Sequence, residues 1–252
     1  MDTQKLNGQE SLNNIFLSPH FDDICFSLGA LAYSQQQGHL VNVFTVSNYV
    51  TEHFHQNTNA YSVQDVTKIR SEEDAQFSKM CGLVGHNLAM KESPVLGIHP
   101  FDLTNLDSHI LAIESELISY VLKLQNHNQN NLLYCPMGIG GHRDHQVILG
   151  AVIKNIDDLI KKMSILFYFD LPYSSNVQAL EDGLANFQKL VKKHIFSTYA
   201  KELDEKERAL KLKMIGFYQS QIFNPINPSH FTVGHQSEGA KMCEMLVKIM
   251  PK

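Results

Sequence analysis

Short apolar runs that alternate with helical patterns predict an α/β fold, a single Rossmann-like domain with a mostly parallel sheet flanked by helices. The chain has 252 residues, of which 43% are hydrophobic, so it can bury one sizeable core. We therefore expect residues 1–252 to form one domain, with a mainly helical C-terminal third. In such sheets ligands bind outside the carboxyl ends of the strands, so polar residues directly after a strand are the first candidates for a site.

The expected strands are short runs rich in apolar residues. They cover Asn14–Leu17, His39–Val46, Leu83–Met90, Asn131–Cys135 and Ser164–Phe169. The expected helices show apolar residues at helical spacing. They cover Asp22–Gln37, Asp65–Cys81, Asp107–Gln125, Asp144–Ile156, Glu205–Ile222 and Glu238–Ile249. Gly38 is the expected C-cap of the first helix, and Asp65 is the expected N-cap of the second. Residues 48–64, 91–106 and 223–236 are expected to be loops.

The composition argues against several classes of protein. The formal net charge is −5 and no basic stripe stands out, so nucleic acid is a poor candidate for a partner. The four cysteines have neither metal-site nor redox spacing, and we expect reduced thiols. The N-terminal segment MDTQKLNGQESLNN is polar, and no apolar run is long enough to span a bilayer. A cytoplasmic protein with no signal peptide and no transmembrane segment is expected.

The segment FLSPHFDDICFSLGALA, residues 16–32, joins an expected strand to an expected helix. The apolar run stops at Pro19, and His20, Asp22 and Asp23 follow at once. We expect these three side chains at the carboxyl end of the first strand, the edge of the sheet at which ligands gather.

A second segment, LLYCPMGIGGHRDHQVILGAV, residues 132–152, has the same design. A strand runs into a proline, a glycine-rich loop follows, and His142, Asp144 and His145 precede an apolar helical pattern. If the two strands are near neighbours, the two clusters face each other across one cleft.

Together the clusters contain the ligands of a catalytic metal site. Such zinc sites use three protein ligands, commonly imidazole and carboxylate, and leave one position open. His20 and Asp23 are three residues apart and share one side of the first helical turn, and His145 would complete the set.

The remaining residues of the clusters supply the acid and base of a hydrolase. Asp22 is free to act as a base on water, and His142 is free to act as an acid. Asp144 could hold the ring of His142, since a carboxylate fixes the tautomer and the orientation of an imidazole.

Simpler interpretations stay open at this point. Asp22 and Asp23, each taken alone, fit the acids that favour the start of any helix. The histidines of the second cluster, each taken alone, fit surface residues between a loop and a helix. GIGG also resembles part of a dinucleotide loop, although Arg143 stands where the third glycine belongs. A nucleotide-binding α/β protein, such as a dehydrogenase, is therefore an alternative with an incomplete fingerprint.

SPHFDD followed by GGHRDH resembles the PIG-L/LmbE-like family of zinc-dependent N-acetylglucosaminyl de-N-acetylases. The resemblance covers most of the chain, because RSEEDAQFSKMCG, YFDLPYSS and KLKMIGFYQSQI are similar to other regions of family members. It implies a Rossmann-like fold, a zinc ion held by His20, Asp23 and His145, and Asp22 as the general base.

The resemblance implies roles for other residues as well. His142, held by Asp144, would act as general acid or help to stabilise the oxyanion, and Arg70 would contact sugar hydroxyls. Spacing alone favours an exposed ion pair between Arg70 and Glu73 instead. The Asp-Gly substrate segment of the family is matched loosely by LGIHPFDLTN, in which Asp102 is the candidate substrate contact.

Two departures from the family pattern concern the site. Many members carry Glu directly after the paired aspartates, where this chain has Ile24. Some members carry a tyrosine two residues before the first histidine of the second motif, where this chain has Gly140. Tyr173 and Tyr49 are the candidates to replace it, and Tyr173 is also a candidate substrate contact.

The expected reaction is removal of the N-acetyl group from an N-acetylglucosamine-type amino sugar conjugate, with release of acetate. The expected cofactor is Zn²⁺ or another divalent transition metal, and the expected partner is the small-molecule conjugate. Self-association is an expectation from the family. The alternatives are a weakly active or inactive homologue that binds metal and sugar, and a hydrolase of another amide.

Overall fold

The computed structural model describes residues 12–55, 61–222, 225–235 and 240–250. Residues 1–11 of the polar N-terminal segment lie outside these ranges, as do parts of the loops expected at 48–64 and 223–236. Within the described residues, no helix is both long enough and apolar enough to cross a membrane.

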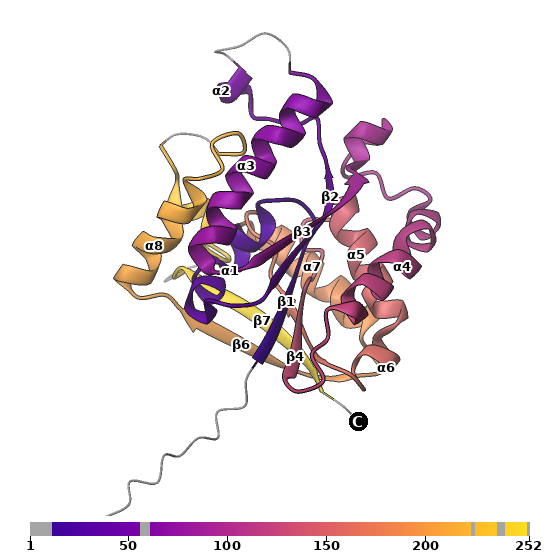
Figure 1. The fold of residues 1–252 in the computed structure, drawn as a ribbon. Helices are drawn as coiled ribbons and strands as arrows, with labels where there is room; N and C mark the ends of the chain where they lie inside the picture. The colour runs from indigo at the N-terminus through magenta and orange to yellow at the C-terminus, as the bar shows by residue number, and fades with distance from the viewer. Residues whose placement is uncertain (1–11, 56–60, 223–224, 236–239, 251–252) are drawn as a thin grey trace, which may run out of the picture.

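A central sheet with helices on both faces organises the described part of the chain (Figure 1). The strands are β1 (Leu12–Ser18), β2 (His39–Val46), β3 (Val84–Lys91), β4 (Asn130–Pro136), β5 (Ser164–Tyr168), β6 (Ile195–Glu202) and β7 (Cys243–Met250). Their order in the sheet is β3-β2-β1-β4-β5-β7-β6. The first five pair in parallel, and β7 pairs antiparallel with both β5 and β6. The predicted α/β class with a mostly parallel sheet is confirmed.

The helices divide between the two faces of the sheet. They are α1 (Asp23–Gln35), α2 (Glu52–His55), α3 (Val63–Cys81), α4 (Leu106–Lys123), α5 (Arg143–Lys154), α6 (Ile156–Leu159), α7 (Val177–Leu190) and α8 (Glu205–Ile215), with short 3₁₀ turns η1 (Ser93–Leu96), η2 (Tyr173–Ser175) and η3 (Pro228–Phe231). Side chains alternate along a strand, so Ile15 and Leu17 of β1 pack with α4 to α7, whereas Phe16 packs with α1, α3 and α8.

The two motif segments meet at the point where the strand order reverses. β1 and β4 are adjacent and parallel, with Phe16 paired to Tyr134. The chain leaves β1 towards β2 on one side, while β4 and β5 extend the sheet on the other. Open α/β sheets bind ligands at such a switch point, in the crevice at the carboxyl ends of the strands. The topology therefore places the starts of α1 and α5 at one crevice.

The expectation of a mainly helical C-terminal third is wrong in its last part. The helix expected over Glu238–Ile249 is instead strand β7, since residues 243–250 pair with both β5 and β6. The spacing of apolar residues in CEMLVKIM fits either period, and the sheet contacts decide between them. β6 was not expected. Its residues are mostly exposed, so no buried face imposes an alternating apolar pattern on its sequence. The helix expected over Glu205–Ile222 ends at Ile215.

The expected N-cap of α3 is also wrong by three residues. Ser62 is the cap, and its hydroxyl accepts the N–H of Asp65, whose carboxylate in turn accepts the N–H of Ser62. Asp65 therefore occupies the third helical position of a capping box, where an acidic side chain can satisfy the N–H of the cap residue.

Candidate metal centre and active site

The turn after β1 points its acidic residues inward instead of using them as simple caps. Asp22 occupies the N-cap position of α1, but its side chain makes no capping hydrogen bond. Asp23 opens the helix, and its Oδ2 accepts the backbone N–H of His20 at 2.7 Å. Both His20 and Asp23 are buried. The capping interpretation therefore does not account for this pair of aspartates.

The loop after β4 brings two histidines to the start of α5. His142 is the N-cap residue, and its Nδ1 accepts the N–H of Asp144 at 3.3 Å. Because Nδ1 acts as an acceptor, the proton of the neutral ring lies on Nε2. His145 lies at the third position of α5 and is completely buried.

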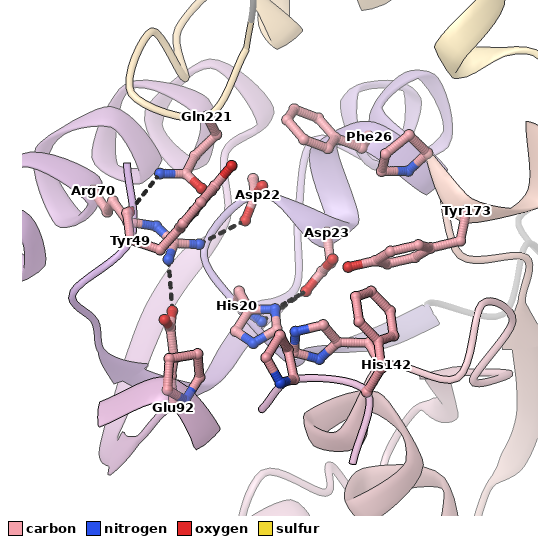
Figure 2. A pocket seen from close by; sticks show the side chains of 14 residues that line it. His20, Asp22, Asp23, Phe26, Tyr49, Arg70, Glu92, His142, Tyr173 and Gln221 are labelled. Atoms are coloured by element: carbon pink, nitrogen blue, oxygen red, sulfur yellow. Dashed lines mark hydrogen bonds and ion pairs between the residues drawn. The ribbon is translucent and has the colours of Figure 1, made fainter. Parts of the chain in front are cut away.

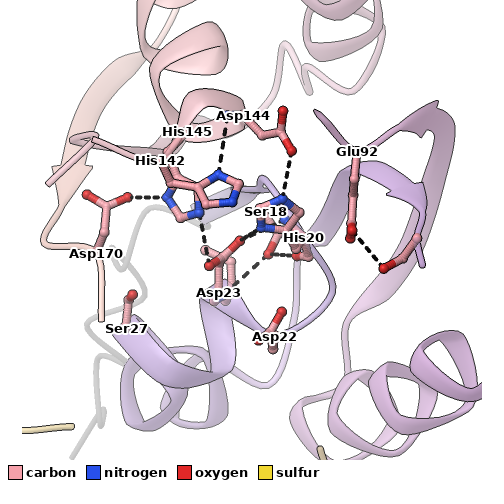
Figure 3. Close-up of polar contacts among 12 residues, drawn as sticks. Ser18, His20, Asp22, Asp23, Ser27, Glu92, His142, Asp144, His145 and Asp170 are labelled. Carbon is pink, nitrogen blue, oxygen red and sulfur yellow. Dashed lines mark hydrogen bonds and ion pairs between the residues drawn. The ribbon is translucent and has the colours of Figure 1, made fainter. Parts of the chain in front are cut away.

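The two junctions form one polar cluster (Figure 3). One ring nitrogen from each of His20, His142 and His145 lies within 4.8 Å of the other two. Asp23 bridges two of these rings, since its Oδ2 is 3.2 Å from Nδ1 of His20 and its Oδ1 is 3.4 Å from Nε2 of His145. The predicted meeting of the two clusters across one cleft is thus what the structure shows.

A buried carboxylate stands behind each of the two histidines that face Asp23. Asp144 lies 3.1 Å from Nε2 of His20, and Asp170 lies 2.7 Å from Nδ1 of His145. Asp144 also accepts the N–H and the hydroxyl of Ser93. We expected Asp144 to hold the ring of His142, but its carboxylate holds His20 instead.

This arrangement fits a divalent cation. If both rings are neutral, each donates its N–H to the supporting carboxylate and directs the lone pair of its other nitrogen at an oxygen of Asp23. In each contact, a ring nitrogen lone pair and a carboxylate oxygen of Asp23 are then 3.2–3.4 Å apart, and these two acceptors repel each other unless a cation lies near both. Nε2 of His145 is also buried without a hydrogen-bond partner. Histidines that bind a metal usually donate their other ring N–H to a carboxylate, as His20 and His145 do here, so His20, Asp23 and His145 fit a metal such as zinc.

The neighbouring carboxylates also shift the pKa values of the histidines. Burial lowers the pKa of His20, but its hydrogen bonds to Asp144 and Asp23 outweigh burial and raise that pKa well above the ordinary value. The pKa of His145 is raised too, because the charge of Asp23 and the contact with Asp170 outweigh burial. Burial and the two neighbouring histidines lower the pKa of His142 to about 2. The centre therefore stabilises positive charge between His20 and His145, and keeps His142 neutral.

A cavity of about 360 Å³ opens beside this cluster (Figure 2). Its volume is typical of a small-molecule site. Charged and amide side chains form one part of the lining, and aromatic rings and prolines form another. The lining residues are His20, Asp22, Asp23, Phe26, Tyr49, Arg70, Glu92, Pro94, Pro100, Phe101, His142, Pro172, Tyr173 and Gln221.

Comparison with known families matches residues 15–156 to PIG-L, described as GlcNAc-PI de-N-acetylase. The match covers more than half of the chain, and it contains both motifs. This chain belongs to the PIG-L family.

Individual relatives agree with this membership. The chain is 27% identical over 173 residues to 2'-N-acetylparomamine deacetylase of Streptomyces fradiae, a match that spans 66% of this chain and 60% of that relative. A deacetylase of teicoplanin biosynthesis has a TM-score of 0.70 at 15% identity, over 96% of this chain and 99% of its own. N,N'-diacetylchitobiose deacetylase from Pyrococcus horikoshii has a TM-score of 0.56 at 15% identity, over 99% and 87%. These two structures share the fold of this PIG-L protein.

Arg70 lies in the pocket of this PIG-L protein, but its guanidinium is held by protein side chains. Its Nη2 donates to Asp22 at 3.0 Å, and its Nη1 donates to Glu92 at 2.6 Å and to Ser47 at 2.7 Å. The ion pair with Glu73 that spacing favoured is wrong, because the Glu73 carboxylate accepts the N–H and hydroxyl of Ser220 instead. Arg70 therefore orients Asp22 directly, in addition to any contact it makes with a sugar.

The structure does not bring Asp102 into the pocket. Its exposed carboxylate accepts the N–H of Thr104 at 2.8 Å and so closes a turn. Arg143, buried at the second motif, donates to the backbone carbonyls of Asp102 and Thr104. The residues of this segment that line the pocket are Pro100 and Phe101.

Several pocket and support residues were not predicted, and three of them are polar residues that follow a strand or a helix. Glu92 directly follows β3, Asp170 follows β5, and Gln221 follows α8. The position of Glu92 and Asp170 at strand ends was a usable signal, since Asp170 lies in the quoted segment YFDLPYSS. Neither could be assigned a partner before the strand order was known.

Of the two tyrosines proposed to replace the one absent at Gly140, Tyr173 is the closer to the centre. Its ring lies edge-on to His145, with 5.6 Å between ring centroids, and 6.1 Å from His142. Tyr49 lies at the rim and is 54% exposed.

Proposed function

We propose that this protein is a metal-dependent hydrolase that removes the N-acetyl group from an N-acetylglucosamine-type amino sugar conjugate. The observation that carries the proposal is the convergence of His20 and His145 on the two oxygens of Asp23, at the wall of a cavity of about 360 Å³. Membership of the PIG-L family supports the reaction class. The Streptomyces fradiae relative is a 2'-N-acetylparomamine deacetylase by name, and this supports the substrate class.

His20, Asp23 and His145 are the proposed ligands, and zinc is the metal we propose first. When bound there, such a metal would supply a Lewis acid for the amide carbonyl and make water acidic enough to attack near neutral pH. Asp144 and Asp170 hold the two histidine rings in the orientation that ligation needs.

Asp22 is the proposed general base. Its carboxylate lines the cavity next to Asp23, and Arg70 fixes one of its oxygens at 3.0 Å. A proton leaves the attacking water for Asp22, and the same proton can pass to the amine nitrogen as the C–N bond breaks. His142 presents Nε2–H to the pocket, so it can donate a hydrogen bond to the leaving nitrogen. The products are acetate and the free amine.

Acetate release from defined substrates tests this function. The protein is stripped with a chelator, reloaded with zinc, and assayed with N-acetylglucosamine conjugates that carry an inositol, a small acid or an aminoglycoside. Turnover of at least one conjugate is expected. The Asp22→Asn variant should keep the metal and lose about 10²–10⁴-fold in turnover.

An N-acetylated lysine peptide serves as the control for amide specificity. Release of acetate from the peptide but from no amino sugar would replace the proposed substrate class by another amide. Metal-loaded protein that releases acetate from neither would contradict the proposed reaction, and an unaffected Asp22→Asn variant would contradict the assignment of the base.

A further inference from the structure

One hydroxyl of the pocket wall has no role in the reaction as described so far. Tyr173 lies in η2, directly after the segment that carries Asp170. Figure 2 shows its ring running along the cavity, with the hydroxyl pointing towards Asp23. The ring is fixed by edge-on packing against His145 at 5.6 Å and by the ring of Phe101 at 6.3 Å.

The loop of the second motif leaves room for this ring. A Cβ placed on Gly140 would lie 2.5 Å from Cβ, 2.6 Å from Cγ and 2.8 Å from Cδ1 of Tyr173. Contacts this short do not occur between carbon atoms, so no side chain fits at position 140 while Tyr173 keeps its place. Gly140 also has a φ of +88°, which disfavours other residues. Gly140 and Tyr173 therefore act as a complementary pair.

Other hydrogen-bond donors at the pocket already have partners, lie farther from the centre, or have another role in the proposed reaction. The two terminal nitrogens of Arg70 already donate to Asp22, Glu92 and Ser47. The ring of Tyr49 belongs to the rim, and its residue is half exposed. The Nε2–H of His142 also faces the pocket, but it is assigned above to the leaving nitrogen. Tyr173 presents a second donor beside Asp23 and His145 (Figure 2).

We propose that Tyr173 is a catalytic residue whose hydroxyl donates a hydrogen bond to the carbonyl oxygen of the scissile amide, and that Gly140 is bare in order to admit its ring. The proposal rests on the function proposed above. As water adds to the carbonyl carbon, the C=O π pair moves to oxygen, and the O–H of Tyr173 stabilises that negative charge. Tyr173 keeps its proton throughout, because the proton from water goes to Asp22 and then to the amine.

The first test removes only the hydroxyl. Loss of one donor to an oxyanion lowers kcat by about 10²–10³-fold. We expect Tyr173→Phe to show such a loss, with KM changed less than about threefold because the interaction strengthens only in the transition state. Zinc content and thermal denaturation should match the wild type. Affinity for a methylphosphonamidate of glucosamine, whose tetrahedral anionic oxygen resembles the transition state, should fall by at least about tenfold.

The second test uses two neighbouring glycines as a matched pair. Gly140 and Gly141 have φ of +88° and +72°, so alanine strains the backbone at both. Only at Gly140 does the added Cβ meet Tyr173, since Gly141 has no atom within 4 Å of that position. Gly140→Ala should therefore lose more turnover than Gly141→Ala. In the Tyr173→Phe background, the extra loss from Gly140→Ala should shrink, because the donor is already gone.

The outcomes separate this inference from the proposed function. A wild type without deacetylase turnover overturns both. An active wild type with a Tyr173→Phe variant of equal kcat overturns the inference alone. A large loss in Tyr49→Phe, with Tyr173→Phe unaffected, would make Tyr49 the donor and also overturn it. A Tyr173→Phe variant that has lost zinc or stability in proportion to its activity would show a structural role, which contradicts the assignment.

Discussion

Single buried carboxylates in this protein differ in what stands opposite them. Asp144 and Asp170 face histidine rings, and the partly buried Asp22 faces Arg70. Asp74 instead accepts hydrogen bonds from the amide of Asn42 at 2.8 Å and the hydroxyl of Tyr218 at 3.1 Å. Because neither partner is a cation, burial dominates and raises the pKa of Asp74 to about 7.

This pKa makes stability depend on pH. The unfolded chain ionises Asp74 near its ordinary pKa of about 4. Between about pH 4 and 7 the native state holds the extra proton, so the free energy of unfolding falls as pH rises. Above about pH 7 Asp74 is ionised in both states, and the native state carries the full free-energy cost of a buried carboxylate. Asp74→Asn removes this titration, so its free energy of unfolding relative to wild type should rise by up to about 4 kcal/mol from pH 4 to pH 8.

Urea unfolding of both proteins across that pH range measures the effect. Asp65→Asn is the control, since Asp65 is an exposed carboxylate in the capping box of the same helix. A difference between Asp74→Asn and wild type that does not change with pH would contradict the burial argument.

At the same scale, the sequence predicted the motif residues but not their supports. His20, Asp22 and Asp23 were singled out because they directly follow an apolar strand run, and His142 and His145 because they follow a second run after a glycine-rich loop. The partner of Asp144 was assigned to the nearest histidine in sequence, whereas the fold presents His20 to it from another strand. Where two strand-to-helix junctions contact each other, the nearest residue along the chain is often not the hydrogen-bond partner.

Among the elements, α1 depends on the C-terminal strand. The helix departs from helical geometry at Leu28, and the freed N–H groups of Ala30 and Leu31 donate to Glu244 of β7, both at 2.8 Å. Lys211 of α8 is fully buried and pairs with Glu244 at 2.9 Å. The carboxylate of Glu244 therefore caps the second half of α1 from within the fold, and this stabilises the helix that begins at Asp23.

Glu244→Gln should lower the free energy of unfolding by about 3–5 kcal/mol, because it leaves Lys211 buried without a counter-charge. Adding Lys211→Met should recover part of that loss, since it removes the unpaired charge. Chemical denaturation measures both. Lys241→Met is the control, because the Lys241–Glu202 pair is exposed and contributes less than about 1 kcal/mol. Equal effects in the two pairs would contradict the role given to Glu244.

This strand was also the main error in the predicted elements. An internal cap for α1 needs a carboxylate at one position of β7, and no local pattern in CEMLVKIM distinguishes that strand from a helix. The parallel arrangement of β1 to β5 was predicted from strand and helix alternation, whereas their order in the sheet and the antiparallel addition of β6 and β7 are tertiary choices.

At the scale of the whole molecule, the adjacent strands β1 and β4 bring the two motifs together in the one proposed metal site. The sequence did not show that the two strands are neighbours. The parallel pairing of β1 with β4, with Phe16 opposite Tyr134, shows that they are. A mutation at one junction should therefore abolish metal binding by ligands from the other.

The measurement that tests this most directly is metal content by elemental analysis of wild type, His145→Ala and His39→Ala after zinc loading and dialysis. His39 pairs with His86 at 3.0 Å, at the start of β2, and is the control for losing a histidine elsewhere. We expect about one zinc per chain in wild type and His39→Ala, and loss of that zinc in His145→Ala. Equal zinc in all three proteins, or none in the wild type, would contradict it.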